Sequence, residues 1–362
     1  MKKKYVLVDG MYRSGTSVMM RLFDGVPSCL VLPFEDGILR AVYHHKNEFD
    51  KTFKTRDFLR LRNCLCHIKY WDLEKVSDRE FFSFRVPKEA ASQVEFDFKE
   101  FDADFKNRMN GLEEWSLENF VDAFFGCVSE NINLLPDAET VSHFFMKTPI
   151  STPAIPLFLK TFEDAFVIYL IRDPRATYVS VMKFGGKTIP LIDGVPRKHL
   201  NNWQKNVKSI MNLTDACKNR IRIVKYEDLI THTEDVMKGL SQFLCLEYSE
   251  ALCKPTLLGL PWYGYSSHVH RQKGIDEDAA ERWKECYDDQ IRDAVCFFLD
   301  PNIRKRFGYD SGGHQLRNLA FCRIVIRLVI LRHLSYVSEK VLEGISALDL
   351  RIQRLVRRIF RI

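Results

Sequence analysis

The strongest structural signal in this sequence lies in residues 5–17, Tyr-Val-Leu-Val-Asp-Gly-Met-Tyr-Arg-Ser-Gly-Thr-Ser. The first four residues are aromatic or aliphatic and favour a buried strand. A glycine-containing loop follows, and apolar residues at helical spacing then predict a helix over residues 15–25. A strand, a tight loop and a helix N-terminus together direct backbone N–H groups and the positive end of the helix dipole at one point. These residues therefore predict an anion-binding loop, with an ordinary strand–helix turn as the alternative.

The loop has the spacing Gly-x-x-x-x-Gly from Gly10 to Gly15, which resembles a Walker A loop. That motif continues with a lysine that reaches the β- and γ-phosphates, and Thr16 stands in its place here. The substitution argues against ordinary ATP or GTP hydrolysis. The cation lies inside the loop instead, so the candidate anion ligands are Arg13, Ser14, Gly15, Thr16 and Ser17.

A second anion site is predicted where the apolar residues 167–171 end in Arg172. Pro174 suits the first turn of a helix, and Ser180 then lies about two turns into that helix. The Arg172 fork and the Ser180 hydroxyl are suited to one phosphate, whereas the alternative is a salt-bridged helix start with a surface serine. Ligands of open parallel sheets bind at the carboxyl ends of the strands, so a ligand with phosphate at both ends would need both sites.

Strand and helix patterns alternate along the chain. Strands are predicted at residues 30–34, 141–146, 166–171 and 221–224, and helices at 152–162, 174–183, 197–217, 233–245 and 277–298. The alternation predicts an α/β fold, a three-layer sandwich with a central parallel sheet. Residues 1–312 would form this domain, with a mostly helical insertion at about 40–140, and residues 313–362 a helical C-terminal extension.

These motifs resemble those of the sulfotransferase family, which uses 3′-phosphoadenylyl sulfate (PAPS). Residues 12–17 are similar to the family's 5′-phosphosulfate loop, and Arg172-Asp173-Pro174-Arg175 with Ser180 is similar to its 3′-phosphate motif. Residues 224–229, Val-Lys-Tyr-Glu-Asp-Leu, are similar to its strand-end signature. The order and separations of the motifs agree across roughly residues 4–310.

The resemblance implies a role for each matching residue. Residues 13–17 would hold the 5′-phosphate and the sulfuryl oxygens, Arg172 and Ser180 the 3′-phosphate, and Tyr226 would lie near the adenine. The product would be adenosine 3′,5′-bisphosphate (PAP), and no metal is implied. A family loop that closes over the 3′-phosphate is matched less well, because Gln272 interrupts it, and a solvated basic loop is the alternative there; its residues are Arg271, Lys273 and Gly274.

Charge stabilisation during transfer needs cations near the leaving phosphate. Arg13 and the loop amides suit this task. Lys147, which follows a predicted strand, resembles the family's lysine near the bridging oxygen, with a surface lysine as the alternative.

The catalytic base is sought from the same resemblance. Cytosolic members carry a histidine where this chain has Pro149, whereas carbohydrate- and tyrosine-modifying members tend to use a glutamate after the second strand. Glu35 stands at about that place, and a carboxylate half-buried beside Phe34 would have a raised pKa. A helix-capping or salt-bridged role for Glu35 is the alternative, and the other candidate bases are Asp36 and His143.

The net charge of +6 is unevenly distributed, because residues 314–362 hold ten Lys/Arg and only three Asp/Glu. The remainder is close to neutral, and motifs for nucleic-acid binding are missing, so no nucleic-acid partner is expected. Residues 316–334 and 350–362 interleave arginines with apolar residues, a pattern that suits an anionic membrane surface. Packing on the body of the protein or on a second subunit is the alternative.

The apolar run after the N-terminal lysines is too short for a signal peptide, and no stretch of 18 uncharged apolar residues occurs. The ten cysteines, Cys64 and Cys66 among them, lack zinc-site spacing and are expected as reduced thiols. We therefore expect a cytoplasmic enzyme, peripheral at the inner face of the membrane.

The acceptor would be a hydroxyl or amine of a glycan, a glycolipid or lipid-linked sugar, or a small molecule. The aromatic residues of the insertion either stack on sugar rings or form a helical core, and we favour the core. Two other functions stay open at this point. One is a P-loop kinase of a small molecule, and the other is a non-catalytic nucleotide-binding module recruited to membranes by the tail.

Overall fold

The computed structural model describes residues 2–44, 88–111, 116–148, 152–184, 197–217, 219–264, 274–286 and 299–309. The chain divides into two compact units, the first of Met1–Lys187 with Lys205–Trp283 and the second of Thr188–Gln204 with Lys284–Ile362. Several expectations fall outside the described residues: Arg271, Lys273, Cys64, Cys66, Pro149, the first part of the insertion and the whole tail from 313 onwards.

The first unit is built on a five-stranded parallel sheet in the order β2-β3-β1-β4-β5, which confirms the predicted α/β class. The strands are β1 (Lys4–Gly10), β2 (Cys29–Val31), β3 (His143–Lys147), β4 (Phe166–Ile171) and β5 (Ile221–Lys225). Val6 pairs with Phe145 on one side and Phe166 on the other. Apolar side chains on both faces of β1, β3 and β4 are buried, as a sheet covered by helices on both sides requires.

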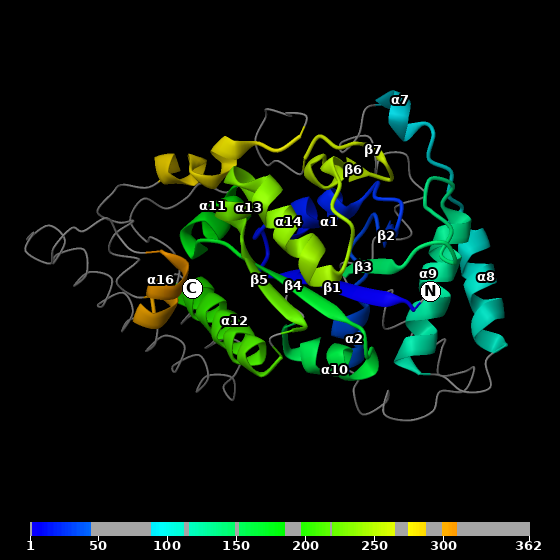
Figure 1. The fold of residues 1–362 in the computed structure, drawn as a ribbon, viewed down its shortest axis with the longest axis horizontal. Helices are drawn as coiled ribbons and strands as arrows, with labels where there is room; N and C mark the ends of the chain where they lie inside the picture. The colour runs from blue at the N-terminus through cyan, green and yellow to red at the C-terminus, as the bar shows by residue number, and fades with distance from the viewer. Residues whose placement is uncertain are drawn as a thin grey trace, which may run out of the picture. The chain divides into compact units, whose positions relative to one another are not determined.

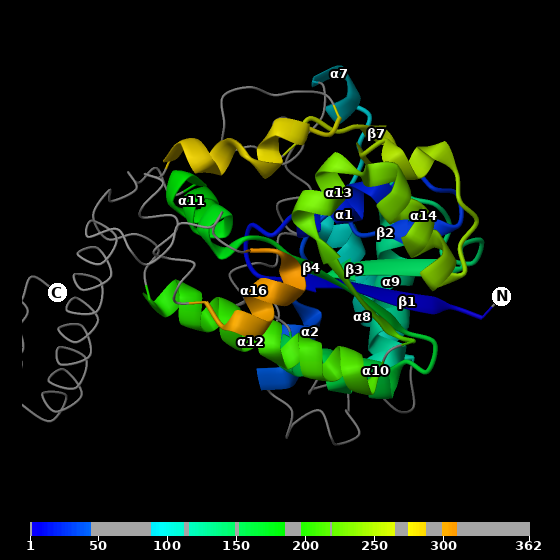
Figure 2. The same ribbon diagram turned by 60° about the vertical axis from the view of Figure 1, so that its left-hand side comes forward.

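Helices cover both faces of this sheet (Figures 1 and 2). On one face lie α1 (Thr16–Phe23), α13 (Tyr226–Thr231) and α14 (Thr233–Leu244). On the other lie α2 (Ile38–His44), α10 (Ile155–Thr161) and residues 205–216 of α12 (Arg197–Ala216). The predicted three-layer arrangement is therefore present in the first unit. Other described elements of this unit are α7 (Lys88–Ala91), η1 (Thr152–Ala154), α11 (Pro174–Phe184), η2 (Glu250–Cys253), β6 (Thr256–Leu257) and β7 (Leu260–Pro261).

The described part of the insertion contains a helical hairpin, α8 (Phe98–Asn110) and α9 (Leu117–Asn131). The Asp97 carboxylate and the Ser116 hydroxyl cap the two helices by accepting hydrogen bonds from first-turn N–H groups. Phe105 meets Phe120 edge-on with ring centroids 5.4 Å apart. The aromatic residues described here thus form a core, as expected, and Phe101 and Phe105 are both buried.

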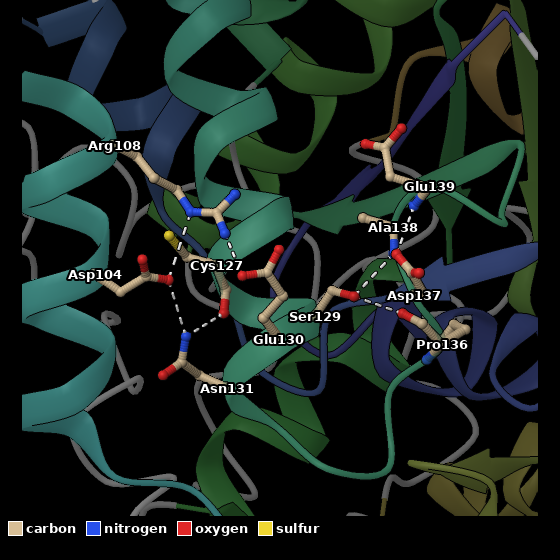
Figure 3. A network of polar contacts seen from close by, with 10 residues as sticks. All are labelled: Asp104, Arg108, Cys127, Ser129, Glu130, Asn131, Pro136, Asp137, Ala138 and Glu139. Atoms are coloured by element: carbon tan, nitrogen blue, oxygen red, sulfur yellow. Dashed lines mark hydrogen bonds and ion pairs between the residues drawn. The ribbon is translucent and has the colours of Figure 1, made fainter. Parts of the chain in front are cut away.

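A polar network ties the two helices of the hairpin together (Figure 3). Arg108 of α8 forms ion pairs with Asp104 and with Glu130 of α9. The Asn131 amide donates to the Asp104 carboxylate at 3.3 Å. Close by, the Ser129 hydroxyl accepts from the Ala138 N–H at 2.9 Å and donates to the Pro136 carbonyl at 2.7 Å, so it fixes the turn that leads towards β3.

Three elements differ from expectation. The strand predicted at 30–34 ends at Val31, because Pro33 has no N–H for the sheet. Residues 226–231, expected only as a strand-end signature, form α13. The start of the helix predicted at 277–298 is two 3₁₀ turns, η3 (Glu277–Ala280) and η4 (Arg282–Cys286). The Ala279 carbonyl accepts from Arg172 at 2.9 Å, so it is engaged outside its own helix.

In the second unit, the described residues are the start of α12, the end of η4, α16 (Pro301–Phe307) and the residues that flank α16. The Asp300 carboxylate caps α16, and its own N–H donates to the Gln204 side chain at 2.7 Å. Tyr309 meets Trp203 with ring centroids 5.9 Å apart. Across the described ranges, the structure contains no helix with the length and apolar character that crossing a bilayer demands.

Replacing Phe124 with alanine tests how far the hairpin depends on its aromatic core. Phe124 is fully buried against Phe101, Phe105 and Phe34. Phe124→Ala should therefore lower the free energy of unfolding by about 3–5 kcal/mol, measured by urea denaturation. As a control, Val181→Ala at an exposed position of α11 should change it by no more than about 0.5 kcal/mol. Equal losses in the two variants would contradict this account of the core.

Candidate functional site

Five strand ends bring polar residues to one edge of the sheet. Because all strands are parallel, their carboxyl ends meet there. Gly10 ends β1, Lys147 ends β3, and Arg172 and Tyr226 directly follow β4 and β5. Glu35 follows β2 after a short turn. Residues far apart in the sequence are therefore collected at the edge where open parallel sheets bind their ligands.

The loop after β1 has a backbone arranged for an anion. Arg13 has φ 66° and Gly15 has φ 97°, so two of three successive residues are left-handed. The Ser14 hydroxyl donates to the Met11 carbonyl at 2.6 Å and closes the turn from inside. Helix α1 begins at Thr16, and its N-cap residue, Gly15, has no side chain to cap the first N–H groups. First-turn N–H groups and the helix dipole together favour a bound anion at such a helix start.

The two predicted anion sites form one cluster. The Arg13 Nε donates to the Ser180 hydroxyl at 2.9 Å. Arg172 donates to the Arg13 carbonyl at 3.1 Å, and its other terminal nitrogen donates to the Ala279 carbonyl at 2.9 Å. Two guanidinium groups and a hydroxyl therefore stand side by side next to the α1 N-terminus, which makes the edge strongly attractive to anions.

Tyr226 lies beneath this cluster. The Arg172 guanidinium is 4.0 Å from the centroid of the Tyr226 ring, a cation–π distance. The ring also packs against Gly15, where an added Cβ would lie 2.3 Å from Tyr226 Cδ2. Burial raises the pKa of the Tyr226 hydroxyl. Gly15 is therefore required both by its left-handed φ and by the close approach of this ring.

Lys147 is a buried residue, so the alternative of a surface lysine is wrong. Its Nζ donates to the Ser17 hydroxyl at 2.9 Å and lies 2.7 Å from Glu35 Oε1. Burial lowers the pKa of Lys147, and the Glu35 carboxylate opposes that shift. Glu35 is thus ion-paired, while 29% of its side-chain surface stays exposed. The candidate base, the candidate cation and Ser17 of the candidate anion-binding segment are therefore in direct contact.

The other two candidate bases are placed differently. Asp36 is fully buried, and its carboxylate accepts hydrogen bonds from the Lys147 N–H, the Thr148 hydroxyl and the Ile38 N–H. Burial raises the pKa of Asp36 to about 6. His143 lies at the amino end of β3, where its Nε2 meets the Leu244 carbonyl at 3.0 Å. The structure therefore does not bring His143 to the edge that holds Lys147.

Several residues that support the site had no individual role predicted from the sequence. Arg175 forms a buried ion pair with Asp173, and its guanidinium is 4.8 Å from the Trp283 ring centroid. The Glu227 carboxylate accepts from the Asp173 N–H at 3.0 Å, and burial raises the pKa of Glu227. These polar residues lie within or beside the matched motifs, and that position was the available signal. They fix the backbone that carries Arg172 and Tyr226.

Arg21 was also missed. Its Nη2 donates to the Pro33 carbonyl at 2.8 Å, although the residue is almost wholly buried within α1. An arginine in an otherwise apolar helix face was the signal for such a role. Gly274 has φ 93° and begins the described segment 274–286. Within the described part of the chain, no group of three His, Cys, Asp or Glu residues is placed to hold a metal ion.

The family model described as "Sulfotransferase family" matches residues 6–250 of this sequence. Among solved structures, the chain is similar to the sulfotransferase domain of the olefin synthase of Synechococcus PCC 7002, with 17% identity, 78% of this chain and 89% of that chain covered, and a TM-score of 0.47. It is also similar to the sulfotransferase domain of the curacin biosynthetic pathway, with 16% identity, 91% and 99% covered, and a TM-score of 0.46. No curated protein matches it.

Gly15→Ala tests the packing of the loop on Tyr226. The new Cβ would strain the left-handed backbone and collide with the ring, so the free energy of unfolding should fall by at least about 2 kcal/mol. Gly239 of α14 is the matched control, because an added Cβ there meets nothing within 4 Å. Gly239→Ala should stabilise the protein by about 0.5–1 kcal/mol in the same urea titration. If Gly15→Ala were as stable as Gly239→Ala, the close approach of Tyr226 would be disproved.

Proposed function

The chain belongs to the sulfotransferase family, and we propose that it transfers the sulfuryl group of PAPS to a hydroxyl or amine of an acceptor. One observation carries the proposal: Arg13, Arg172 and Ser180 form a single cationic cluster beside the α1 N-terminus. PAPS carries anionic groups on both its 5′ and 3′ sides. A cluster that joins two strand ends is suited to such a molecule.

Each half of the cluster fits one end of the nucleotide. Arg13 and the N–H groups at the start of α1 would hold the 5′-phosphosulfate, with the Thr16 and Ser17 hydroxyls beside them. Arg172 and Ser180 would hold the 3′-phosphate. Arg172 donates to two neutral carbonyl oxygens in the structure, and a phosphate is a stronger partner for a guanidinium than either. Tyr226 would support Arg172 from below and lie near the adenine.

The transfer step needs a proton acceptor and a cation at the leaving oxygen. The acceptor oxygen or nitrogen would attack sulfur as the bond from sulfur to the 5′-phosphate oxygen breaks. Glu35 would take the proton, because its carboxylate is partly exposed while its other side is held by Lys147. Lys147, bonded to Ser17 of the phosphate loop, would stabilise the negative charge that develops on the leaving phosphate.

We propose a glycan, a lipid-linked sugar or a small molecule as the acceptor. This acceptor class is supported by the glutamate after β2 together with Pro149 in place of the histidine of cytosolic members. Transfer of ³⁵S-sulfate from PAPS to glycan, lipid and metabolite fractions tests the acceptor.

We also propose a cytoplasmic enzyme that contacts the membrane through residues 314–362. The basic amphipathic pattern of this tail supports membrane contact. Liposome co-sedimentation with and without residues 314–362 tests it.

Glu35→Gln should slow ³⁵S transfer by about 10²–10⁴-fold, because the amide cannot take the acceptor's proton. Affinity for PAP, measured by titration calorimetry, should stay within about threefold of the unmodified chain, since Glu35 does not belong to the nucleotide cluster. Glu130→Gln, which removes an ion-paired carboxylate from α9, is the control and should transfer at the normal rate. Normal turnover in Glu35→Gln would remove Glu35 from the role of base.

Arg172→Ala should weaken PAPS binding by about 10- to 100-fold, the expected loss for a charge-assisted contact with phosphate. Adenylyl sulfate lacks the 3′-phosphate and should bind more weakly than PAPS. Arg172→Ala should therefore change the affinity for adenylyl sulfate much less than the affinity for PAPS. Arg108→Ala removes an ion-paired arginine from α8 and should leave both affinities unchanged. An equal loss for the two nucleotides in Arg172→Ala would show that Arg172 does not read the 3′-phosphate.

A further inference from the structure

The turn that carries Glu35, residues 32–36, is fixed by backbone contacts at both of its ends. At its start, the Leu32 N–H donates to the Phe145 carbonyl at 3.2 Å. The Pro33 carbonyl accepts from the buried Arg21 at 2.8 Å. At its end, the Asp36 N–H donates to the Lys147 carbonyl at 3.3 Å. The turn is thus tied to β3 on both sides of Glu35.

The Asp36 carboxylate completes this attachment. One oxygen accepts from the Lys147 N–H at 2.9 Å. The other accepts from the Thr148 hydroxyl at 2.9 Å and from the Ile38 N–H at 2.9 Å. A single buried side chain therefore connects the end of β3, the turn after β2 and the start of α2. Its neighbours in sequence and in space are the two residues of the ion pair, Glu35 and Lys147.

We propose that Asp36 is a positioning residue for sulfuryl transfer, which sets the separation of Glu35 and Lys147 through the backbone. The inference rests on the proposed function, in which Glu35 is the base and Lys147 the cation. An ion pair with a partly exposed carboxylate is a weak constraint by itself, because water competes for the exposed oxygen. The clamp by Asp36 ties the backbone of Lys147 to the turn that carries Glu35, so the two side chains that meet at 2.7 Å start from fixed backbone positions.

The chemistry of the contact explains why the residue is an aspartate. Three donors face its two oxygens, and an acceptor-only group satisfies all three. Asparagine would keep one acceptor oxygen but turn an NH₂ group towards a donor. Alanine would leave two buried N–H groups and a buried hydroxyl unsatisfied. Asp36→Asn is therefore the milder variant, and Thr148→Val, which removes only one donor, is milder still.

Labelling of Lys147 tests the positioning without any ligand. The Lys147 side chain is 5% exposed, so reductive methylation followed by mass spectrometry should find it almost unreactive. Asp36→Asn should raise its labelling rate by about 10-fold or more, because the backbone that buries the ammonium is released. Ser129→Ala is the matched control, since it also removes a buried group that bonds two backbone atoms, at the hairpin in Figure 3. It should leave Lys147 protected.

Turnover with water as the acceptor provides the second test. Water attacks the sulfur of ³⁵S-labelled PAPS, the bond to the 5′-phosphate oxygen breaks, and the water proton passes to Glu35 and then to solvent, which leaves sulfate and PAP. Asp36→Asn should lower kcat by about 10–100-fold, the expected effect of a misplacement of about 1 Å. The Kd for PAP should stay within about threefold of the unmodified value. In a Glu35→Gln background, Asp36→Asn should cost less than about threefold more, because both changes disable the same pair.

The outcomes separate the two proposals. Faster labelling of Lys147 with a kcat loss that vanishes in the Glu35→Gln background supports the positioning role. Labelling equal to that of Ser129→Ala, or a kcat loss fully additive with Glu35→Gln, overturns it. If Asp36→Asn does not fold, Thr148→Val must show the same two effects at smaller size, and their absence overturns the inference equally. A folded wild-type chain that does not bind PAP, or that binds PAPS without transferring or releasing its sulfuryl group, would overturn the proposed function. The positioning role of Asp36 in transfer would fall with it, while the labelling result would still describe the clamp.

Discussion

The candidate site depends on the contacts that the Arg172 guanidinium makes. Its Cζ lies over the Tyr226 ring, 4.0 Å from the centroid, and its two terminal nitrogens donate to the carbonyls of Arg13 and Ala279. The loop after β1, the start of α13 and the turn η3 are therefore held by one side chain that follows β4. The N–H donors of an arginine form a rigid planar fork. Arg172 therefore fixes the positions of these three segments relative to one another as well as holding them together.

The same edge of the sheet carries a second arrangement around Lys147. Here the charges are compensated within the protein: the ammonium meets Glu35, and its burial is offset by that ion pair and by Ser17. At the Arg13 and Arg172 cluster, the guanidinium groups donate to carbonyl and hydroxyl oxygens. In the proposed function, the nucleotide binds at this cluster and the transfer chemistry takes place beside Lys147.

The sequence allowed the edge to be predicted but not the contacts within it. Strand patterns place Arg13, Lys147 and Arg172 after strands of one parallel sheet, so their arrival at one edge follows from topology alone. Which side chains then bond depends on packing between elements far apart in the chain. The link from Arg13 to Ser180 spans 167 residues, and the link from Lys147 to Ser17 spans 130. No local pattern encodes either one.

Asp36 and His143 are two residues whose positions relative to the site could not be predicted from the sequence. Both are alternative candidate bases to Glu35 in the sequence. Strand polarity separates His143 from Lys147 by the length of β3, and three donors occupy the Asp36 carboxylate. The spacing of apolar residues also could not predict the 3₁₀ turn η3. The Ala279 carbonyl accepts a hydrogen bond from Arg172, which is more than 100 positions away in the sequence.

The contact between Phe34 and Phe124, with ring centroids 6.2 Å apart, has a consequence for how such an enzyme diverges. Phe34 precedes Glu35, and Phe124 belongs to the aromatic layer between α8 and α9. The insertion therefore packs against the turn that carries Glu35 and is part of the same core as the sheet. A related protein with a different segment in place of the insertion would need another aromatic ring, or an equal apolar surface, to pack against Phe34. Changes in the insertion are therefore constrained by the need to keep Glu35 in position.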